Sequence, residues 1–566
     1  MREQTMFNAV INFFKMMLLS FQLALCISLL GLCSGHRYLK FERKSSTPQK
    51  PEWPSRYRVD GILSLPYAEL NEPFVGWFDA EAKKSRIDYY EGISKTIQRG
   101  DKGEFGAHFL VAPMSNEVQL NQINCFELSG TSEEPALPQS LLPDMENFTY
   151  TGEKAFMDFK VDIWQYKYGD DNKYNVYTLY VKKDSSIPVY YEMIGYDSLL
   201  GSHYDEYKIR YFNLNTDYLD DVFDEPTKGM ECHGFPGPGY EAQVVSNPMR
   251  EFIFPEDQSH LPSMYKEFIK KYEKEHEESR KHTFKHNLRY INSMNRKKLT
   301  FKLKVNHLAD HSPDELRKLR GRRTSKKSEK NVSNAKPFIK TMKVSDLPTD
   351  INWRLFGAVT PVKDQAVCGS CWSFGTTGAI EGALFLKTGR LVRLSEQNLM
   401  DCSWGFGNNG CDGGEEFRAY EYIMKHGGIA TDDSYGNYLG IDGYCHQKSS
   451  VIGAKIASYV NVTSGDMDAL KMAIVQHGPI AVGIDAAHLA FVFYSHGVYY
   501  NPECGNKPEN LDHAVLAVGY GVQNGEPYTL VKNSWSTHWG NDGYVLMSQR
   551  DNNCGVATDA TFVNLA

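Results

Sequence analysis

The sequence QAVCGSCWSF at residues 365–374 places two cysteines directly before an apolar, helix-forming stretch. That stretch runs on to Lys387 and Gly389, a basic residue and a glycine that are typical of a helix C-terminus. Cys371 is therefore predicted to lie in the first turn of a buried helix. Unpaired amides and the helix dipole stabilise an anion there, which lowers the pKa of a thiol. The pattern favours Cys371 as a nucleophile.

Two cysteines three residues apart, Cys368 and Cys371, also begin many zinc sites. Such a site needs a second close pair, whereas Cys402 and Cys411 are nine residues apart and Cys445 stands alone. We therefore expect no metal and no other cofactor.

A cysteine nucleophile needs a base of near-neutral pKa that takes its proton and later protonates the leaving amine. His513 stands at the head of an alternating, strand-like segment, and Asn533 comes just past a second one. On adjacent strands, Asn533 would accept from one imidazole nitrogen and fix the ring. Gln365 and the backbone amide of Cys371 would donate to the oxyanion, an effect worth about 3 kcal/mol per donor.

The CGSCW motif at 368–372 resembles the signature of the papain and cathepsin family of cysteine proteases. His513 follows Cys371 by 142 residues, within that family's spacing of roughly 130–150. The resemblance implies an α+β fold of two lobes, a helical one around Cys371 and a β-barrel-like one carrying His513 and Asn533. It assigns Cys371 as nucleophile, His513 as base, Asn533 as orienting residue and Gln365 as oxyanion donor. Its substrate-binding positions are Gly413, Gly414, Glu416, Asp512, Trp535 and Asp559, of which Trp535 also shields the His–Asn pair from water.

Eleven cysteines are present, and Cys26 and Cys33 fall in a leader segment, so nine remain. In an oxidising compartment an odd number leaves at least one free thiol. The family resemblance pairs Cys368 with Cys411, Cys402 with Cys445 and Cys504 with Cys554, which leaves Cys371 free. We expect a further bridge between Cys125 and Cys232.

Residues 262–295 have a charged, amphipathic, helical pattern with an apolar stripe. The stripe consists of Phe268, Tyr272, Phe284, Leu288 and Ile291. The segment also resembles the family's inhibitory propeptide, through Arg280, Phe284, Asn287, Ile291 and Asn295, and then through Asn306, Leu308 and Asp310. His276 and Lys304 depart from the usual glutamate and glycine, as Ala366 and Ser536 depart from glycines in the catalytic region.

We expect residues 247–346 to be a linker and a propeptide that occupies the cleft. The basic run at 317–327 is interpreted as a solvated, flexible linker, a kind of segment that proteases cut. Cleavage near 340–350 would release an enzyme of about 220 residues, predicted as residues 347–566.

Residues 36–246 are rich in tyrosine and in runs of period two, such as YNVYTLYV at 174–181. They predict an antiparallel β domain of unknown role, with a linker at 234–239 near its C-terminal end. The layout resembles the two-chain cathepsin-like proteases of insect blood cells, with the N-terminal domain staying attached as a second chain.

Residues 1–35 combine Lys15, an apolar run and small residues, a pattern typical of a signal peptide. An uncleaved membrane anchor is the alternative, because the run is close to the minimum for a span. Glycosylation triplets at Asn147, Asn331 and Asn461 fit the secretory route, with a lysosome, granule or extracellular destination and no membrane attachment after signal removal. The net charge of −8 gives no general attraction to nucleic acid.

The expected partners are protein or peptide substrates, the propeptide as an intramolecular inhibitor, and cystatin-like inhibitors. By the family resemblance, Glu416 and Asp559 lie in the pocket for the substrate side chain one residue before the cleaved residue. This leads to the hypothesis that the pocket accepts arginine or lysine as well as bulky apolar side chains. The alternative is that both acids face solvent.

Two other function classes are open. An inactive homologue acting as a binding protein is disfavoured because all four catalytic positions are filled. A β domain that carries a lipid or another ligand is compatible with proteolysis.

Overall fold

The computed structural model describes residues 47–116, 118–199, 201–235, 240–254, 260–325 and 335–566. The predicted signal peptide and the triplet at Asn331 lie outside these residues. Within the described ranges, no helix has the length and apolar character needed to cross a bilayer. Residues 50–566 pack into one unit.

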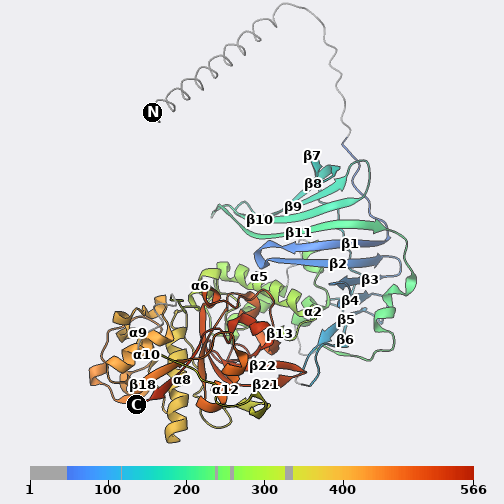
Figure 1. The fold of residues 1–566 in the computed structure, drawn as a ribbon. Coiled ribbons are helices and arrows are strands. Elements are labelled where there is room, and N and C mark those ends of the chain that lie inside the picture. Colours follow the sequence, from blue (N-terminus) through green and yellow to red (C-terminus); the bar gives the residue numbers. More distant parts are fainter. Residues whose placement is uncertain (1–46, 117, 200, 236–239, 255–259, 326–334) are drawn as a thin grey trace, which may run out of the picture. The chain divides into compact units, whose positions relative to one another are not determined.

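The tyrosine-rich N-terminal segment forms one curled sheet of twelve strands (Figure 1). In β1 every second residue is buried, the pattern of a sheet with one face against a core. The strand order is β12-β6-β5-β4-β3-β2-β1-β11-β10-β9-β8-β7, and all neighbours are antiparallel except β12 and β6. The strands are β1 Arg56–Leu65, β2 Leu70–Asp79, β3 Lys84–Tyr89, β4 Ser94–Arg99, β5 Ala107–Met114, β6 Gln122–Ser129, β7 Thr149–Phe156, β8 Phe159–Gly169, β9 Lys173–Lys182, β10 Pro188–Asp197, β11 Ser202–Asn215 and β12 Cys232–Gly234. The prediction of an N-terminal antiparallel β domain is confirmed.

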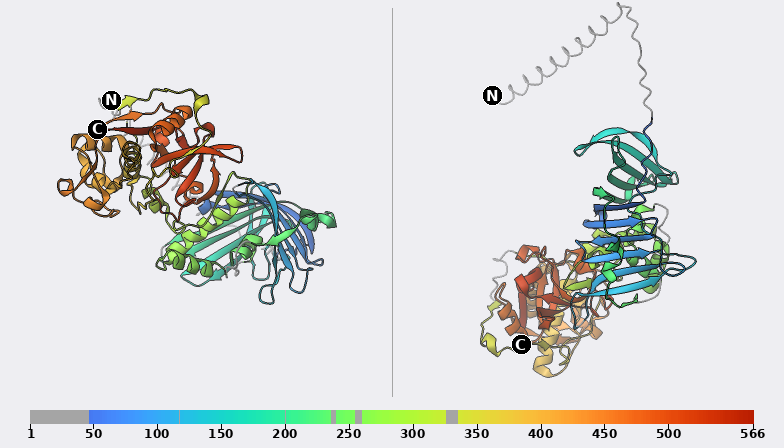
Figure 2. Two further views of the ribbon diagram at one scale, coloured as in Figure 1. Left: turned by 90° about the horizontal axis from the view of Figure 1, so that it is seen from below. Right: turned by 90° about the vertical axis from the view of Figure 1, so that its right-hand side faces the viewer.

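A helical segment follows the sheet. Its elements are α2 Tyr240–Ser246, α3 Arg250–Ile253, α4 His260–Lys271, α5 Glu278–Asn295, β13 Phe301–Leu303, α6 Pro313–Lys318 and β14 Ala335–Pro337. The pattern predicted over 262–295 is two helices rather than one, because the chain turns after α4, with Glu273 at a φ of 53°. Phe252 on α3 joins the core of the β domain, whereas Phe268, Phe284 and Ile291 join the core of the C-terminal region. The segment therefore packs on both neighbours (Figure 2).

The C-terminal region has a helical part and a sheet part. The helices are α8 Cys371–Thr388, α9 Glu396–Cys402, α10 Glu416–Lys425, α11 Asp432–Tyr435, α12 Met467–His477 and α13 Leu489–Val492. The strands are β15 Ile351–Asn352, β16 Ile429–Ala430, β17 Ile452–Ala454, β18 Ile456–Asn461, β19 Ile480–Ile484, β20 Tyr494–Tyr499, β21 His513–Gln523, β22 Glu526–Lys532, β23 Tyr544–Ser548 and β24 Ala560–Leu565.

The large sheet of the C-terminal region also includes two strands of the helical segment that precedes it. Its order is β13-β20-β23-β22-β21-β19-β24-β18-β14, with β15 paired to β21. β13 and β14, both upstream of residue 347, form the two ends of this order. The mixed α+β class predicted from the sequence is confirmed.

Candidate active site

Cys371 is the first residue of α8, and Ser370 is the N-cap. Its thiol is free and buried, and the helix ends before Gly389, whose φ of 71° is left-handed. Disulfide bonds join Cys368 to Cys411, Cys402 to Cys445, Cys504 to Cys554 and Cys125 to Cys232. These are the pairs expected from the sequence. They leave Cys371 as the free thiol among the described residues.

His513 begins β21, and Asn533 follows the antiparallel neighbour β22. Asn533 Oδ1 accepts from Nε2 of His513 at 2.7 Å, so Nδ1 is the imidazole nitrogen left for proton exchange with a thiol. No described residue forms a hydrogen bond with that Nδ1. The Trp535 ring lies 4.7 Å from the imidazole, centroid to centroid, and both rings are buried. Trp535 thus packs against the imidazole of the His–Asn pair.

Three hydrogen bonds hold the side chain of Gln365. Ser534 Oγ donates to Oε1 of Gln365 at 2.6 Å, which turns the amide nitrogen outward. That Nε2 donates to the carbonyl of Cys368 at 2.6 Å and to the carbonyl of Leu319 at 2.9 Å. Leu319 belongs to the upstream segment, so the expected oxyanion donor is already occupied by a carbonyl of the chain itself.

Residues 319–323 run along Gly413 and Gly414, the glycines predicted to bind substrate. Gly414 N donates to Gly321 O at 2.9 Å, and Arg323 N donates to Gly414 O at 3.0 Å. Arg322 N donates to Asp512 O at 2.9 Å. A Cβ on Gly321 would lie 1.8 Å from the carbonyl oxygen of Gly369, so only glycine passes at this point. The interpretation of the whole basic run as a solvated linker was wrong for these residues, because backbone pairing and ion pairs fix them.

The pocket acids hold an arginine. Arg322 Nη2 lies 2.6 Å from Asp559 Oδ2, and its Nε lies 3.3 Å from Glu416 Oε1. Arg322 is 7% exposed and Glu416 3% exposed. The alternative that both acids face solvent is therefore wrong. Next to them, Arg320 lies 3.4 Å from the Asp512 carboxylate.

Burial keeps the candidate catalytic pair neutral in this state. Desolvation raises the pKa of Cys371 to about 12 and lowers the pKa of His513 to about 4. At neutral pH both groups are therefore uncharged.

The residues of the propeptide-like motifs mostly bind within their own segment. Arg280 pairs with Glu315 at 2.6 Å, Asn287 donates to the carbonyl of Ala309, and Asn295 donates to that of Leu303. Asn306 donates to the carbonyl of Val492 and Lys304 to that of Gly540, both in the C-terminal region. Leu308 and Asp310 are buried, and His276 is exposed beside Glu278. The two departures from the family pattern thus fall at an exposed position and at an interdomain contact.

The remaining predicted positions lie as follows. Gly413 has a φ of 107°, and a Cβ there would meet the carbonyl of Gly321. Ala366 and Ser536 take left-handed φ values of 53° and 64°. Of the glycosylation triplets, Asn147 is exposed and Asn461 is half-buried.

Sequence reasoning missed Leu319, Gly321, Arg322 and Arg323 as residues of the cleft. The signal was present, since a glycine flanked by arginines precedes a pocket predicted to hold two acids. Charge complementarity would have matched one arginine to those acids.

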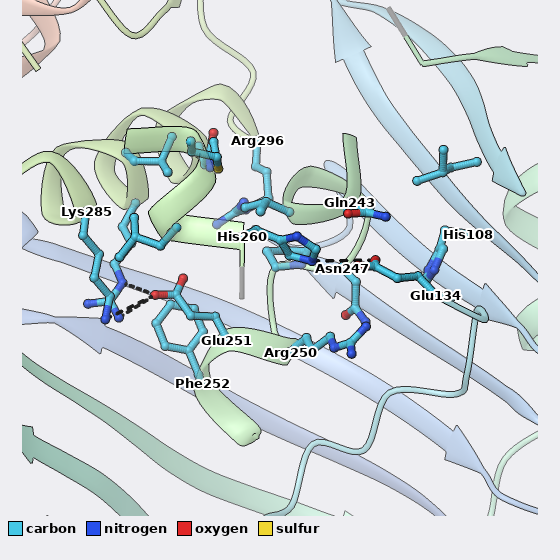
Figure 3. A pocket seen from close by; sticks show the side chains of 18 of the residues that line it. His108, Glu134, Gln243, Asn247, Arg250, Glu251, Phe252, His260, Lys285 and Arg296 are labelled. Atoms are coloured by element: carbon cyan, nitrogen blue, oxygen red, sulfur yellow. Dashed lines mark hydrogen bonds and ion pairs between the residues drawn. The ribbon is translucent and has the colours of Figure 1, made fainter. Parts of the chain in front are cut away.

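A cavity of about 160 Å³ lies between the β domain and helices α2 to α5 (Figure 3). It is lined by apolar side chains such as Val244 and Phe252 and by several polar ones. His108 Nδ1 and Asn247 Oδ1 have no hydrogen-bond partner among the described residues. An engineered cavity of about 150 Å³ holds benzene. This cavity therefore has room for one small ring or a few waters.

Comparison with known proteins gives two family matches. Residues 347–564 match the papain family of cysteine proteases, and residues 265–316 match the cathepsin propeptide inhibitor domain (I29). A cathepsin L-like peptidase of Aedes aegypti is 53% identical over 269 residues, which cover 46% of this chain and 78% of that protein. The chain belongs to the papain family.

Other papain-family relatives agree. Cathepsin L2 of Homo sapiens is 42% identical over 47% of this chain and 78% of its own length. The crystal structure of the ragweed pollen cysteine protease Amb a 11, in its proform, has a TM-score of 0.50 and 33% identity and covers 58% of this chain and 98% of that one. The chain is thus a papain-family cysteine-type endopeptidase that carries a cathepsin-type propeptide. Both family matches lie outside the twelve-stranded sheet.

Proposed function

We propose that this protein is the zymogen of a peptidase that works through a Cys371–His513 thiolate–imidazolium pair. The sulfur attacks the scissile carbonyl carbon, and the oxyanion accepts from Gln365 Nε2 and the Cys371 amide. The tetrahedral intermediate collapses to a thioester as His513 gives its proton to the leaving amine. Water, deprotonated by His513, then hydrolyses the thioester and restores the thiol.

The observation that supports this proposal is the path of residues 319–323. They hold the three features expected of a bound substrate: backbone pairing with Gly414, a carbonyl on Gln365, and a side chain in the acidic pocket. A cleft that binds peptide in this way, over a thiol at a helix N-terminus, suits peptide hydrolysis. The same contacts explain inhibition, because they exclude substrate.

The activation test compares the precursor with its Cys371→Ala variant. Both are acidified, the new N-termini are sequenced, and a peptide amide is supplied. We expect the unchanged precursor alone to cleave itself within residues 339–350, most of which are exposed, and to gain activity. Equal self-cleavage by the alanine variant would refute the proposed nucleophile.

The pocket acids support a preference for basic side chains at the residue before the cleaved one. Arg322 shows that an arginine fits between Glu416 and Asp559 with its charge paired. We expect an ArgArg peptide amide to be cleaved at a rate comparable to that of PheArg, and Asp559→Ala to lose the former selectively. An unchanged preference in Asp559→Ala would contradict this.

Processing and location follow from the leader and the bridges. We propose entry into the secretory pathway and action in lysosomes, granules or outside the cell, with cystatin-like proteins as further inhibitors. Retention of the N-terminal domain as a second chain is part of the same proposal.

The cavity favours a second, compatible function, binding of a small ring with a hydrogen-bond donor by the β domain. Burial lowers the pKa of His108 to about 4, so its ring is neutral, and Asn247 Oδ1 needs a donor. We expect phenol, but not toluene, to raise the melting temperature of the Cys371→Ala precursor, and Asn247→Leu to abolish the effect. Equal shifts with both compounds would contradict a role for the hydrogen bond, and no shift with either compound would contradict binding of a ring.

A further inference from the structure

Helix α5 carries a second buried face besides its apolar one. Phe284, Leu288 and Ile291 lie in the core shared with the catalytic region. Lys285, Arg289 and Ser293, spaced by four residues, are also buried, as is Arg296 at the helix C-cap. We call Lys285, Arg289, Ser293 and Arg296 the outer face of α5. Cations spaced in this way on an isolated helix would remain in solvent, so their burial needs a partner.

The first partner is Asp205 on β11. Its carboxylate lies 2.8 Å from Lys285 Nζ and 2.7 Å from Arg289 Nη1, and the side chain is fully buried. Glu251 on α3 lies 2.7 Å from Arg289 Nη2 and 3.8 Å from Lys285 Nζ (Figure 3). Two cations and two acids therefore meet where α5 crosses the sheet.

The second partner is Glu72 on β2, which is also fully buried. Its two oxygens accept from Arg296 Nε at 2.5 Å and Nη2 at 2.7 Å, a bidentate pair. Ser293 Oγ donates to the same carboxylate at 2.8 Å and lies 2.6 Å from the hydroxyl of Tyr90. Two strands of the sheet thus bind the two ends of the outer face.

The acids of these pairs lie on β2, β11 and α3, outside residues 265–316, which match the propeptide family. The apolar face of α5 is explained by the propeptide and catalytic core, whereas the outer face binds Asp205 and Glu72 of the β domain, with Glu251 of α3 as a further acid. We propose that the N-terminal β domain is a holder for the propeptide, in which Asp205 and Glu72 bind the outer face of α5 and keep the inhibitory segment over the cleft. This assigns a role to the domain whose function neither the motifs nor the family matches supply.

The energetics fit this role. Removing one partner of a buried ion pair typically costs 3–5 kcal/mol, because the other charge stays buried and unpaired. Exposed pairs contribute roughly 0–1 kcal/mol. The chain offers such an exposed pair on the same propeptide, Arg317 with Asp314 at 2.7 Å, both more than two-thirds exposed. It provides a matched control.

The test measures how fast the full-length precursor gains activity at one fixed acidic pH. Asp205→Asn and Glu72→Gln are expected to activate at least about tenfold faster than the unchanged precursor. Asp314→Asn is expected to stay within about twofold. Since the matured catalytic domain is the same in all three, kcat/KM after maturation should not differ. Activation of both variants at the unchanged rate would overturn the holder role.

Three further measurements separate the holder role from general damage and from failure of the proposed chemistry. In the Cys371→Ala background, amide exchange of α5 should quicken in Asp205→Asn and Glu72→Gln, and this readout needs no peptidase activity. Glu72→Gln combined with Arg296→Gln removes both charges. The activation rate of this double variant should be closer to that of the unchanged protein than the rate of Glu72→Gln alone. Should the single acid variants fail to fold, Tyr90→Phe with Ser293→Ala tests the same contact, with about threefold faster activation expected. An unchanged exchange rate of α5 in these variants refutes the proposal.

Discussion

Arg322 Nη2 lies 2.6 Å from Oδ2 of Asp559, so an arginine of the propeptide is ion-paired inside the enzyme's own acidic pocket. Glu416, on the other side of the same guanidinium, completes the pair of acids. In the proposed function these acids have two uses, since they hold residues 319–323 before activation and bind basic side chains of substrates afterwards.

Arg322→Ala should weaken inhibition. It leaves Glu416 and Asp559 facing each other without a cation, and burial already raises the pKa of Glu416. We expect the variant precursor to activate at least about tenfold faster at neutral pH. Arg317→Ala is the control, because Arg317 is exposed and lies two residues before the segment 319–323. It should behave like the unchanged precursor. Identical activation of the two variants would mean that the pocket contact does not hold the propeptide.

Gly321→Ala should give a leaky precursor with an unaffected mature enzyme. The added Cβ would lie 1.8 Å from the Gly369 carbonyl, and that backbone cannot retreat without moving the start of the catalytic helix. We expect residual peptidase activity of the uncut precursor to rise at least about fivefold, from a loss of about 1–3 kcal/mol of packing. Gly234→Ala, where nothing lies within 4 Å of the added Cβ and φ is not positive, is the control for a precursor with one added methyl group. A tight Gly321→Ala precursor would show that residues 319–323 do not occupy the cleft in solution.

Alkylation of Cys371 should report the change of protonation state on activation. Burial raises its pKa to about 12 in the precursor, where a thiolate is nearly absent at neutral pH. We expect iodoacetamide to label the matured protein at least about a thousandfold faster than the precursor. The rate constant is measured by mass spectrometry of the peptide that carries residue 371. Slow labelling of the matured protein would mean that no ion pair forms with His513.

The sequence was enough to predict the C-terminal half, because a nucleophile at a helix N-terminus, a base at the head of a strand and an asparagine past its neighbour are local patterns. It also predicted that the N-terminal region is an antiparallel sheet. It did not predict the path of Leu319 to Arg323, since a basic run has the same composition whether it is solvated or paired with distant acids. Nor did it predict the outer face of α5, whose cations pair with Asp205 and Glu72 on strands 80 residues or more away in the chain. Long-range ion pairs leave no periodic signal, whereas apolar faces do.

Ala366 and Ser536 mark strained backbone next to the site. Both have positive φ, where a Cβ is unfavourable by about 1–2 kcal/mol relative to glycine. Replacing such a residue with glycine relieves this strain, but glycine also makes the unfolded chain more flexible, which offsets part of the gain in stability. We expect Ala366→Gly to raise the free energy of unfolding by about 0.5–1 kcal/mol. Chemical denaturation of the Cys371→Ala precursor measures it, and Ala383→Gly inside α8 should instead destabilise by about the same amount.

Two histidines of α5 should make the precursor less stable in acid. His282 Nε2 lies 2.6 Å from Lys173 Nζ of β9, and the Tyr204 ring packs on it. His286 contacts the Tyr204 carbonyl and stacks on Tyr67. Asp205 and Lys285 act on both imidazoles, and Arg289 acts on that of His286. Desolvation above all lowers both pKa values from 6.5 to about 4. A neutral His282 accepts from the Lys173 ammonium, whereas a protonated one would repel it.

The sign of the effect follows from proton uptake. Between pH 6.5 and about 4 the unfolded chain binds protons at these two positions and the folded chain does not, so stability falls with falling pH across that window and levels off below it. The melting temperature of the Cys371→Ala precursor should therefore drop between pH 6.5 and 4, and His282→Gln with His286→Gln should flatten that drop. His446→Gln, at an exposed position where carbonyl acceptors raise the pKa, is the control and should leave the drop in place. If the melting temperature of the double variant fell as steeply with pH as that of the unchanged precursor, the acid sensitivity would not come from the two histidines of α5.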